Sequence, residues 1–226
     1  SVAHELNNPL EGILTFAKLL IRRIQKTSLP LVEIKAFQDD LKLVADEADR
    51  CGTIVKNLLV FSRQKGGAFQ IAKFKSILDR CVLLVNHYAG MNNVRIKTQC
   101  TEDDNLECDP NQIQQVMLAL MSNAIEAMAV TPERLEGGIL SVDVTLQVAT
   151  KTLGVRISDT GTGMNKETKT HIFEPFFTTK SEGKGVGLGL AIAYGIVERH
   201  HGKVEVETGA GKGTRFTIRL PVSVPR

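Results

Sequence analysis

Apolar residues recur at helical spacing in two runs along the first third of the chain. The first run comprises Val2, Leu6, Leu10, Ile13, Ala17, Leu20 and Ile24, and residues 27–30 interrupt it. The second comprises Ile34, Phe37, Leu41, Val44, Ala48, Cys51, Val55, Leu58 and Ser62, at steps that alternate between three and four. These spacings predict two long helices joined by a short loop, the second ending at Gly66-Gly67.

The alternating steps of the second run form a heptad seam, which favours packing along other helices at a shallow angle. An antiparallel hairpin of two helices buries little apolar surface by itself. We therefore expect residues 1–66 to form half of a four-helix bundle that a homodimer completes. An antiparallel coiled-coil spacer would show the same periodicity, so the seam predicts architecture and not function.

After Gly67 the spacing of the apolar residues changes and helices alternate with strands. Helices are predicted over residues 74–88 and from Asp109-Pro110 to Ala129, where Asp109 is the expected N-cap and Pro110 lies in the first turn. Strands are predicted over residues 93–101, 140–148, around 155–157, 203–207 and 214–220. Mainly hairpin-connected strands mixed with helices predict an α+β fold for residues 67–226, a sandwich with helices on one face of a sheet.

Composition and charge narrow the classes of function. The 226 residues carry a net charge of only +3, with no dense Lys/Arg cluster and no Trp, which argues against nucleic-acid or membrane contact. No apolar stretch is long enough to span a bilayer, and we expect no signal peptide. We expect a cytoplasmic fragment of a longer protein, whose attachment to a membrane outside this fragment stays an open alternative. The four cysteines lack metal-ligand spacing, so reduced thiols are expected.

Two glycine-containing motifs indicate a nucleotide site. Asp159 ends an apolar strand and is followed by Thr-Gly-Thr-Gly; its carboxylate could accept a hydrogen bond from an adenine amine while the glycines let the backbone approach the ring. An ordinary polar turn is the equally weighted alternative. Residues 183–189 are glycine-rich and lead into a helix, an arrangement suited to binding phosphates, although a GxGxG alone is weak evidence.

Polar residues between and beside these motifs extend the predicted site. The segment between Gly163 and Gly183 is expected to be a lid, to which Lys180 and Lys184 add positive charge near the phosphates. Asn123 interrupts an apolar helical run, which is typical either of a satisfied buried amide or of an oxygen ligand for Mg²⁺ beside ATP.

Five motifs in one order resemble the catalytic core of two-component sensor histidine kinases. Residues 4–10 resemble the phosphoacceptor box in its nitrogen-regulation-type form, 115–128 the asparagine box, 159–164 and 185–192 the two glycine boxes, and 172–180 the phenylalanine box. The resemblance implies that residues 67–226 adopt the ATP-binding Bergerat fold shared with DNA gyrase and mismatch-repair ATPases. It also implies ATP and Mg²⁺ as ligands, and a response-regulator receiver domain as the partner that receives the phosphoryl group on an aspartate. The residues implied at the nucleotide are Asn123 (also at the metal), Asp159, Gly161, Gly163, Lys180, Gly185, Gly187, Leu188, Gly189 and Thr214.

His4 is the expected phosphoryl acceptor, and Glu5 and Asn8 share its side of the helix. A neutral imidazole can attack the γ-phosphorus through one ring nitrogen, and Glu5 can take the proton from the other. The pattern Glu5-x-x-Asn8 also matches the family's motif for dephosphorylating the partner, in which the amide orients the attacking water.

Two departures from the family's pattern keep alternatives open. Ala119 stands where these kinases usually carry a second Asn, which predicts slower or weaker phosphoryl transfer and also disfavours a gyrase-like hydrolase, because Ala cannot activate water. The first helix begins closer to the histidine than is usual, which predicts weaker dimerisation. The remaining alternatives are a catalytically silent ATP-binding module that signals through its bundle, and a protein acting mainly as a phosphatase, for which Asn8 is the discriminating residue.

Overall fold

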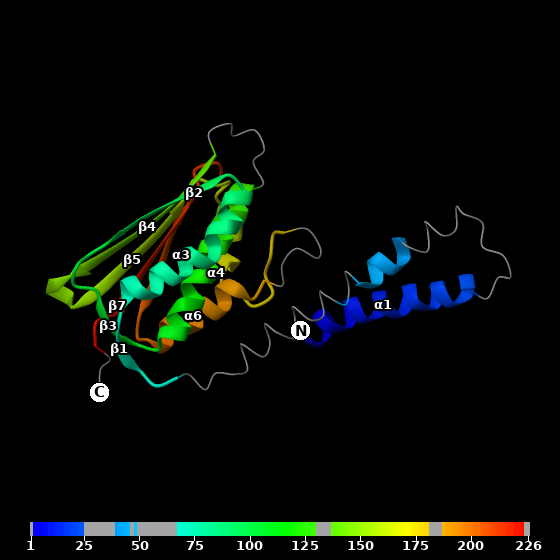
Figure 1. Cartoon of the computed structure of the whole chain (residues 1–226), viewed down its shortest axis with the longest axis horizontal. Helices are drawn as coiled ribbons and strands as arrows, with labels where there is room; N and C mark the ends of the chain where they lie inside the picture. Colours follow the sequence, from blue (N-terminus) through cyan, green and yellow to red (C-terminus); the bar gives the residue numbers. More distant parts are fainter. Residues whose placement is uncertain are drawn as a thin grey trace. The chain divides into compact units, whose positions relative to one another are not determined.

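The computed structural model describes residues 2–24, 39–45, 48, 67–129, 137–180 and 187–223. The chain divides into two compact units, Ser1–Gln64 and Lys65–Arg226. In the first unit, α1 (Val2–Ile24) covers the first apolar run and ends just before the predicted break, and residues 39–45 are also helical (Figure 1). The rest of the predicted second helix, including Cys51, lies outside the described residues.

The second unit is built on a five-stranded sheet with the strand order β2-β4-β5-β7-β6. Its strands are β2 (Val94–Cys100), β4 (Gly138–Gln147), β5 (Thr152–Asp159), β6 (Lys203–Thr208) and β7 (Thr214–Pro221). All neighbouring strands are antiparallel except β2 and β4, which are parallel and are connected through β3 and α4. Buried residues of β4 alternate with half-buried ones, so one face of the sheet is directed to the core.

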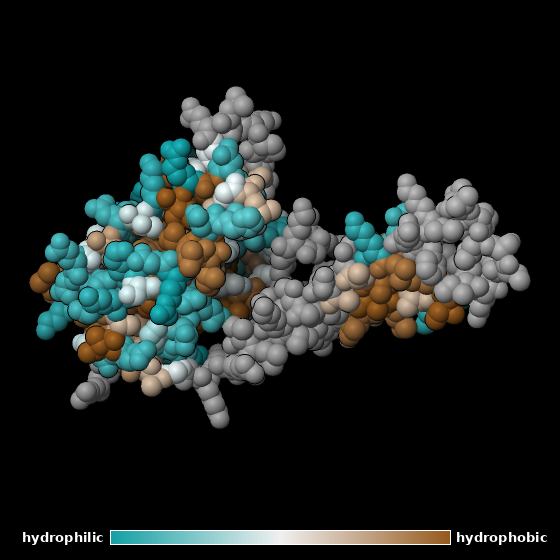
Figure 2. Space-filling view, in the orientation of Figure 1, coloured by the Kyte–Doolittle hydropathy of each residue, from teal (hydrophilic) through white to brown (hydrophobic). Residues whose placement is uncertain are grey.

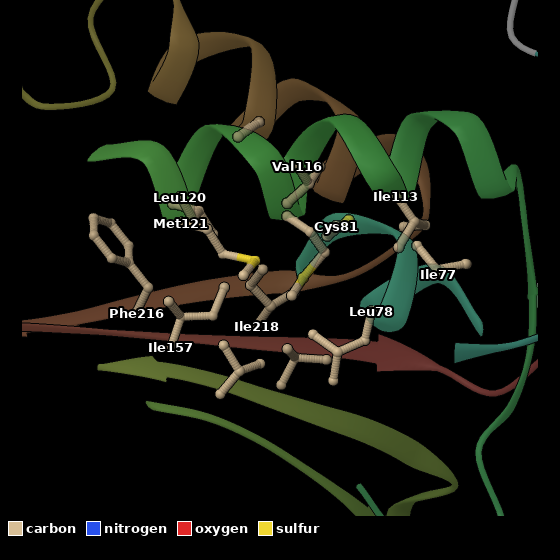
Figure 3. Close-up of a cluster of buried hydrophobic side chains, with 14 of the residues drawn as sticks. Ile77, Leu78, Cys81, Ile113, Val116, Leu120, Met121, Ile157, Phe216 and Ile218 are labelled. Atoms are coloured by element: carbon tan, nitrogen blue, oxygen red, sulfur yellow. The ribbon is translucent and has the colours of Figure 1, made fainter. Parts of the chain in front are cut away.

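Three helices cover that face: α3 (Phe74–Met91), α4 (Pro110–Ala129) and α6 (Gly189–Arg199) (Figure 1). Their apolar sides meet those of the strands in one core, part of which is shown in Figure 3. Fully buried side chains include Leu78 of α3, Met121 of α4, and Ile157 and Ile218 of the sheet. The helix-on-sheet architecture predicted from the alternating periods is confirmed, because each helix has one apolar side to bury.

Two elements arise from contacts that the local sequence pattern does not show. The short strands β1 (Gln70–Lys73) and β3 (Asn105–Cys108) pair with each other in a separate two-stranded sheet. The strand predicted to reach Val148 ends at Gln147 instead, where its last partner is Thr152. Val148 begins a 3₁₀ turn, η1 (Val148–Thr150), and is 76% exposed, because the chain reverses there into β5.

The described cysteines, Cys81, Cys100 and Cys108, form no disulfide. Burial raises the pKa of Cys81 to about 11 and that of Cys108 to about 12. Both thiols therefore stay protonated at neutral pH and act as small apolar side chains.

The first described residues of the second unit lie next to the N-terminus of α4. Asp109 caps the helix, because its Oδ1 accepts hydrogen bonds from the backbone amides of Asn111 (3.0 Å) and Gln112 (3.3 Å). Its Oδ2 accepts from the amide of Gly67 at 2.6 Å, which fixes the first described residue after the N-terminal unit. Asp109, the predicted N-cap, therefore also holds the backbone at Gly67.

His200 completes this anchor from the end of α6. Its Nε2 accepts a hydrogen bond from the Asp109 amide at 3.1 Å, so its Nδ1 carries the proton and donates to the Ile196 carbonyl at 2.8 Å. The ring also lies against Phe69, with centroids 4.7 Å apart. The imidazole is therefore held neutral, and burial lowers its pKa below the ordinary value of 6.5.

We expect the stability of the second unit to fall as the pH drops below 6.5. The unfolded chain protonates His200 in that range more readily than the folded chain, so protons favour unfolding. His200→Gln keeps an acceptor for the Asp109 amide but does not titrate, so its free energy of unfolding should vary less between pH 6.5 and 5.5. Denaturant unfolding across that range measures this, with the exposed His87→Gln as the control. Equal pH dependence in wild type and His200→Gln would contradict the assignment.

Candidate nucleotide-binding site

Asp159 is the last residue of β5, and two backbone amides fix the orientation of its carboxylate. Its Oδ1 accepts hydrogen bonds from the amide of Gly161 at 2.8 Å and from that of Thr214 at 3.1 Å. The first donor lies in the loop after β5 and the second begins the neighbouring strand β7, so the carboxylate ties together two segments far apart in the sequence. A carboxylate held in this way is positioned to accept a further hydrogen bond from a ligand without first losing rotational freedom.

The glycines after Asp159 allow this loop to approach other backbone segments closely. A Cβ at Gly161 would lie 2.9 Å from Ala127 near the end of α4, and one at Gly163, whose φ is +64°, would collide with the carbonyl oxygen of Gly209. The amide of Thr162 donates to the Ala127 carbonyl at 3.3 Å. The first glycine motif is therefore held between α4 and the turn that joins β6 to β7.

Thr208 and Thr214 form a hydroxyl pair beneath this loop. Their Oγ1 atoms are 3.1 Å apart; Thr208 Oγ1 also donates to the carbonyl of Gly213 at 3.0 Å and accepts from the amide of Met164 at 2.9 Å. Thr208 thereby connects β6 to the loop after Asp159. Sequence reasoning missed it, because a threonine at the end of a predicted strand has no distinguishing pattern.

A second group of residues, two of them polar, lies on one side of α4. Ala119, Asn123 and Glu126 are spaced four and three apart, so they form a stripe along the helix. Lys180, from the predicted lid, places its Nζ 3.3 Å from Asn123 Oδ1 and forms an ion pair with Glu126 Oε2. Both carboxylate and ammonium are about one-third exposed, so solvent reaches the pair. The structure thus brings together two predicted site residues and adds Glu126, which sequence reasoning missed although it lies three residues after Asn123.

The end of the glycine-rich loop lies next to the same helix and against the phenylalanine-containing segment. A Cβ at Gly189 would be 4.0 Å from the Cβ of Ala119. Gly187 has a φ of +69°, and a Cβ there would lie 2.6 Å from the Phe177 carbonyl oxygen; its own carbonyl accepts from the Phe176 amide at 3.0 Å. Leu188 is buried and precedes α6. Gly185 and Lys184 lie outside the described residues.

The first part of the predicted lid contains regular structure that the sequence did not indicate. It contains a short helix, α5 (Lys166–His171), which Asn165 caps by accepting a hydrogen bond from the Thr168 amide at 2.7 Å. The ring of Phe173 packs at a tilt of 41° against that of Tyr194 in α6, with centroids 4.9 Å apart, and the ring centroids of Phe177 and His171 are 5.6 Å apart. Both phenylalanines pack against the main core, so they fix the segment that carries Lys180.

His4, Glu5 and Asn8 lie in the first turns of α1. Their spacing places them on one side of that helix, and the positions of their side chains lie outside the described part. Among the described residues, no helix is long and apolar enough to cross a membrane, and no group of three or more His, Cys, Asp or Glu side chains could hold a metal ion.

Comparison with known proteins assigns both halves of the chain. Residues 108–224 match the family described as histidine kinase-, DNA gyrase B- and HSP90-like ATPases, and residues 1–67 match the His kinase A (phosphoacceptor) domain. The sensor histidine kinase ZraS of Escherichia coli strain K12 is 35% identical over 230 residues, which cover all of this chain and 45% of ZraS. Sporulation kinase E of Bacillus subtilis strain 168 is 29% identical, with 98% of this chain and 28% of that protein covered.

Solved structures agree with this assignment. The catalytic domain of histidine kinase ThkA aligns with a TM-score of 0.60 and 28% identity over 69% of this chain and 97% of that one. ThkA in complex with the response regulator protein TrrA aligns with a TM-score of 0.70 and 26% identity over 98% of this chain and 60% of that one.

The fold and the matched residues define an ATP-binding protein of the histidine kinase-, DNA gyrase B- and HSP90-like ATPase family, and the chain belongs to that family. Within it, the preceding phosphoacceptor domain makes the chain a member of the sensor histidine kinases. The chain spans less than half the length of these curated relatives.

Proposed function

We propose that the chain is the core of an ATP:protein-histidine phosphotransferase that phosphorylates His4 and passes the phosphoryl group to an aspartate of a response-regulator receiver domain. The observation that carries the proposal is that one chain joins a phosphoacceptor domain containing His4 to a domain of the ATP-binding family. The complex of the related ThkA with a response regulator supports the identity of the partner.

The contacts around Asp159 support its role in adenine binding. Two backbone amides hold its carboxylate at the end of β5, from which it would accept a hydrogen bond from the exocyclic amine. Gly161 lets the loop after Asp159 pack against Ala127, and the amides of Gly161 and of the buried Thr214 keep the carboxylate in place. A half-buried, pre-oriented acceptor favours adenine over bases that present an oxygen at that position.

The polar stripe of α4 supports binding of the phosphates and Mg²⁺. Asn123 Oδ1 already accepts a cation, the ammonium of Lys180, so its oxygen suits a divalent ion. When bound, Mg²⁺ would neutralise charge on the phosphates. Lys180 would contribute positive charge to the same phosphates, and the segment from Gly187 to Gly189, with the glycines before it, would cover them.

At the acceptor, a ring nitrogen of neutral His4 would attack the γ-phosphorus. The new N–P bond forms as the bond from phosphorus to the bridging oxygen breaks, and ADP leaves. The proton on the other ring nitrogen would pass to Glu5, a contribution on the order of a hundred- to ten-thousand-fold in rate.

Incubation of the protein with ATP labelled at the γ position and with Mg²⁺ tests the proposal. The protein should acquire label that is stable in alkali and labile in acid, as expected of a phosphoramidate. If the protein binds ATP but no label appears, the alternative of a silent ATP-binding module replaces the kinase proposal.

We also propose that residues 1–66 dimerise through their helices. In the single chain, Leu10, Leu14 and Ile21 of α1 are each more than half exposed, and Figure 2 shows apolar residues gathered on this unit. Their spacing of four and seven places them along one side of the helix, where a second chain would cover them. Equilibrium sedimentation should therefore give the mass of a dimer, and Leu14→Glu should shift it toward the monomer; a monomeric wild type would contradict the dimer.

A further inference from the structure

The ammonium of Lys180 lies between two oxygen atoms that come from the same helix. It is 3.3 Å from the amide oxygen of Asn123 and forms an ion pair with the carboxylate of Glu126. We infer that Glu126 is a second ligand of the divalent cation that accompanies the nucleotide, and that Lys180 occupies this cation position until the metal displaces it. The inference rests on the proposed function, because it concerns the same nucleotide site.

The spacing of the two oxygen donors suits a shared cation. Asn123 and Glu126 are three residues apart in α4 and therefore project from one side of it. Both oxygens contact a single nitrogen atom, so they already converge on one point. Mg²⁺ is bound in proteins by one or two side-chain oxygens, with phosphates and water completing its octahedral shell. Ala119, the third member of the stripe, supplies no oxygen.

The ion pair is accessible enough to be exchanged. The side chains of Lys180 and Glu126 remain 37% and 33% exposed, so water and ions reach both charged groups. The ammonium comes from the lid segment, whereas both oxygen donors belong to the helix α4. A divalent cation that binds the two oxygen donors would therefore displace the Lys180 ammonium. The ammonium could then form ion pairs with the phosphates.

A competing role for Glu126 makes the opposite prediction about metal. If Glu126 merely neutralises Lys180, its removal should strengthen nucleotide binding equally with and without metal, because the carboxylate competes with the phosphates. If it ligates the metal, its removal should weaken binding only when Mg²⁺ is present. The ratio of the two affinities therefore separates the two roles.

The experiment is calorimetric titration of ADP into wild-type protein and Glu126→Gln, once with Mg²⁺ and once with EDTA. We expect the strengthening of ADP binding by Mg²⁺ to be about tenfold smaller in Glu126→Gln, with ADP binding in EDTA unchanged or tighter. Electron paramagnetic resonance of Mn²⁺ with ADP gives a direct second measurement, in which Glu126→Gln should bind less of the metal. Glu207→Gln is the matched control, because it breaks an exposed Glu–Arg pair with Arg215 (3.1 Å) between β6 and β7.

The possible results separate this inference from the proposed function. Equal strengthening by Mg²⁺ in wild type and Glu126→Gln, with equal Mn²⁺ binding, would overturn the ligand role while leaving nucleotide binding intact. Failure of the wild-type protein to bind ADP under either condition would overturn the proposed function, and the ligand role with it. Circular dichroism of the variant excludes misfolding as the cause of a loss.

Discussion

Replacing His4 with alanine is expected to abolish labelling of the protein by γ-labelled ATP while leaving the affinity for ADP unchanged. Alanine has no nitrogen that could attack phosphorus, so the loss should be complete rather than partial. The residues proposed to hold the nucleotide lie between Asn123 and Thr214, in the other unit of the chain, and the substitution does not alter them. Labelling measures the transfer, and calorimetry measures the binding.

The matched control is His87→Ala, which removes an exposed histidine from α3. It should keep both labelling and ADP binding. Label that persists on His4→Ala would mean that another residue accepts the phosphoryl group, and it would remove His4 from the mechanism. Parallel loss of ADP binding in His4→Ala would show that the variant disturbs the fold rather than the acceptor.

The second large effect is expected for Asp159→Asn, which should weaken ATP binding by about a hundredfold or more. An asparagine can still accept the hydrogen bonds from Gly161 and Thr214 through its oxygen, so the loop should survive. The other position then carries an NH₂ group, which faces the adenine amine as donor against donor. A buried site that loses its hydrogen-bond complementarity typically loses this much affinity or more.

A change of base tests whether the loss arises at the adenine amine. ITP carries an oxygen in place of that amine, so the wild-type protein should bind it much more weakly than ATP. Asp159→Asn should show little preference between the two. Asp143→Asn is the control, because that residue lies on β4 and lines a hollow with Arg156 and Arg219 on the sheet. ATP binding that survives unchanged in Asp159→Asn would refute the adenine site.

The sequence predicted most of the elements because each has a local pattern. The alternating residues of β4, the apolar sides of α3 and α4, and the cap at Asp109 depend on neighbours within a few positions. The predicted strand over residues 140–148 differs from β4 (Gly138–Gln147) by two residues at its start and one at its end, where a turn to Thr152 ends the strand. The motif order also sufficed to identify the family, which the comparisons confirm.

The site was predicted as a set of residues but not as a set of contacts. Sequence reasoning selected Asp159, Thr214, Asn123 and Lys180, and resemblance, rather than geometry, supplied Thr214. It missed Thr208 and Glu126, since a hydroxyl or carboxylate in an ordinary helix or strand has no pattern that marks it. Their importance arises from Met164 and Lys180, which reach Thr208 and Glu126 from distant parts of the chain, and from Gly213 across the turn between β6 and β7.

The sequence alone therefore determined most of the helical and strand segments, the glycine positions and the family, because periodicity, capping and motif order are local properties. Only the tertiary structure decided that β1 pairs with β3, that Asp159 is fixed from β7, and that Lys180 lies between Asn123 and Glu126. Each of these contacts joins residues more than thirty positions apart, and such pairings depend on how the layers pack rather than on the residues that neighbour them in the chain.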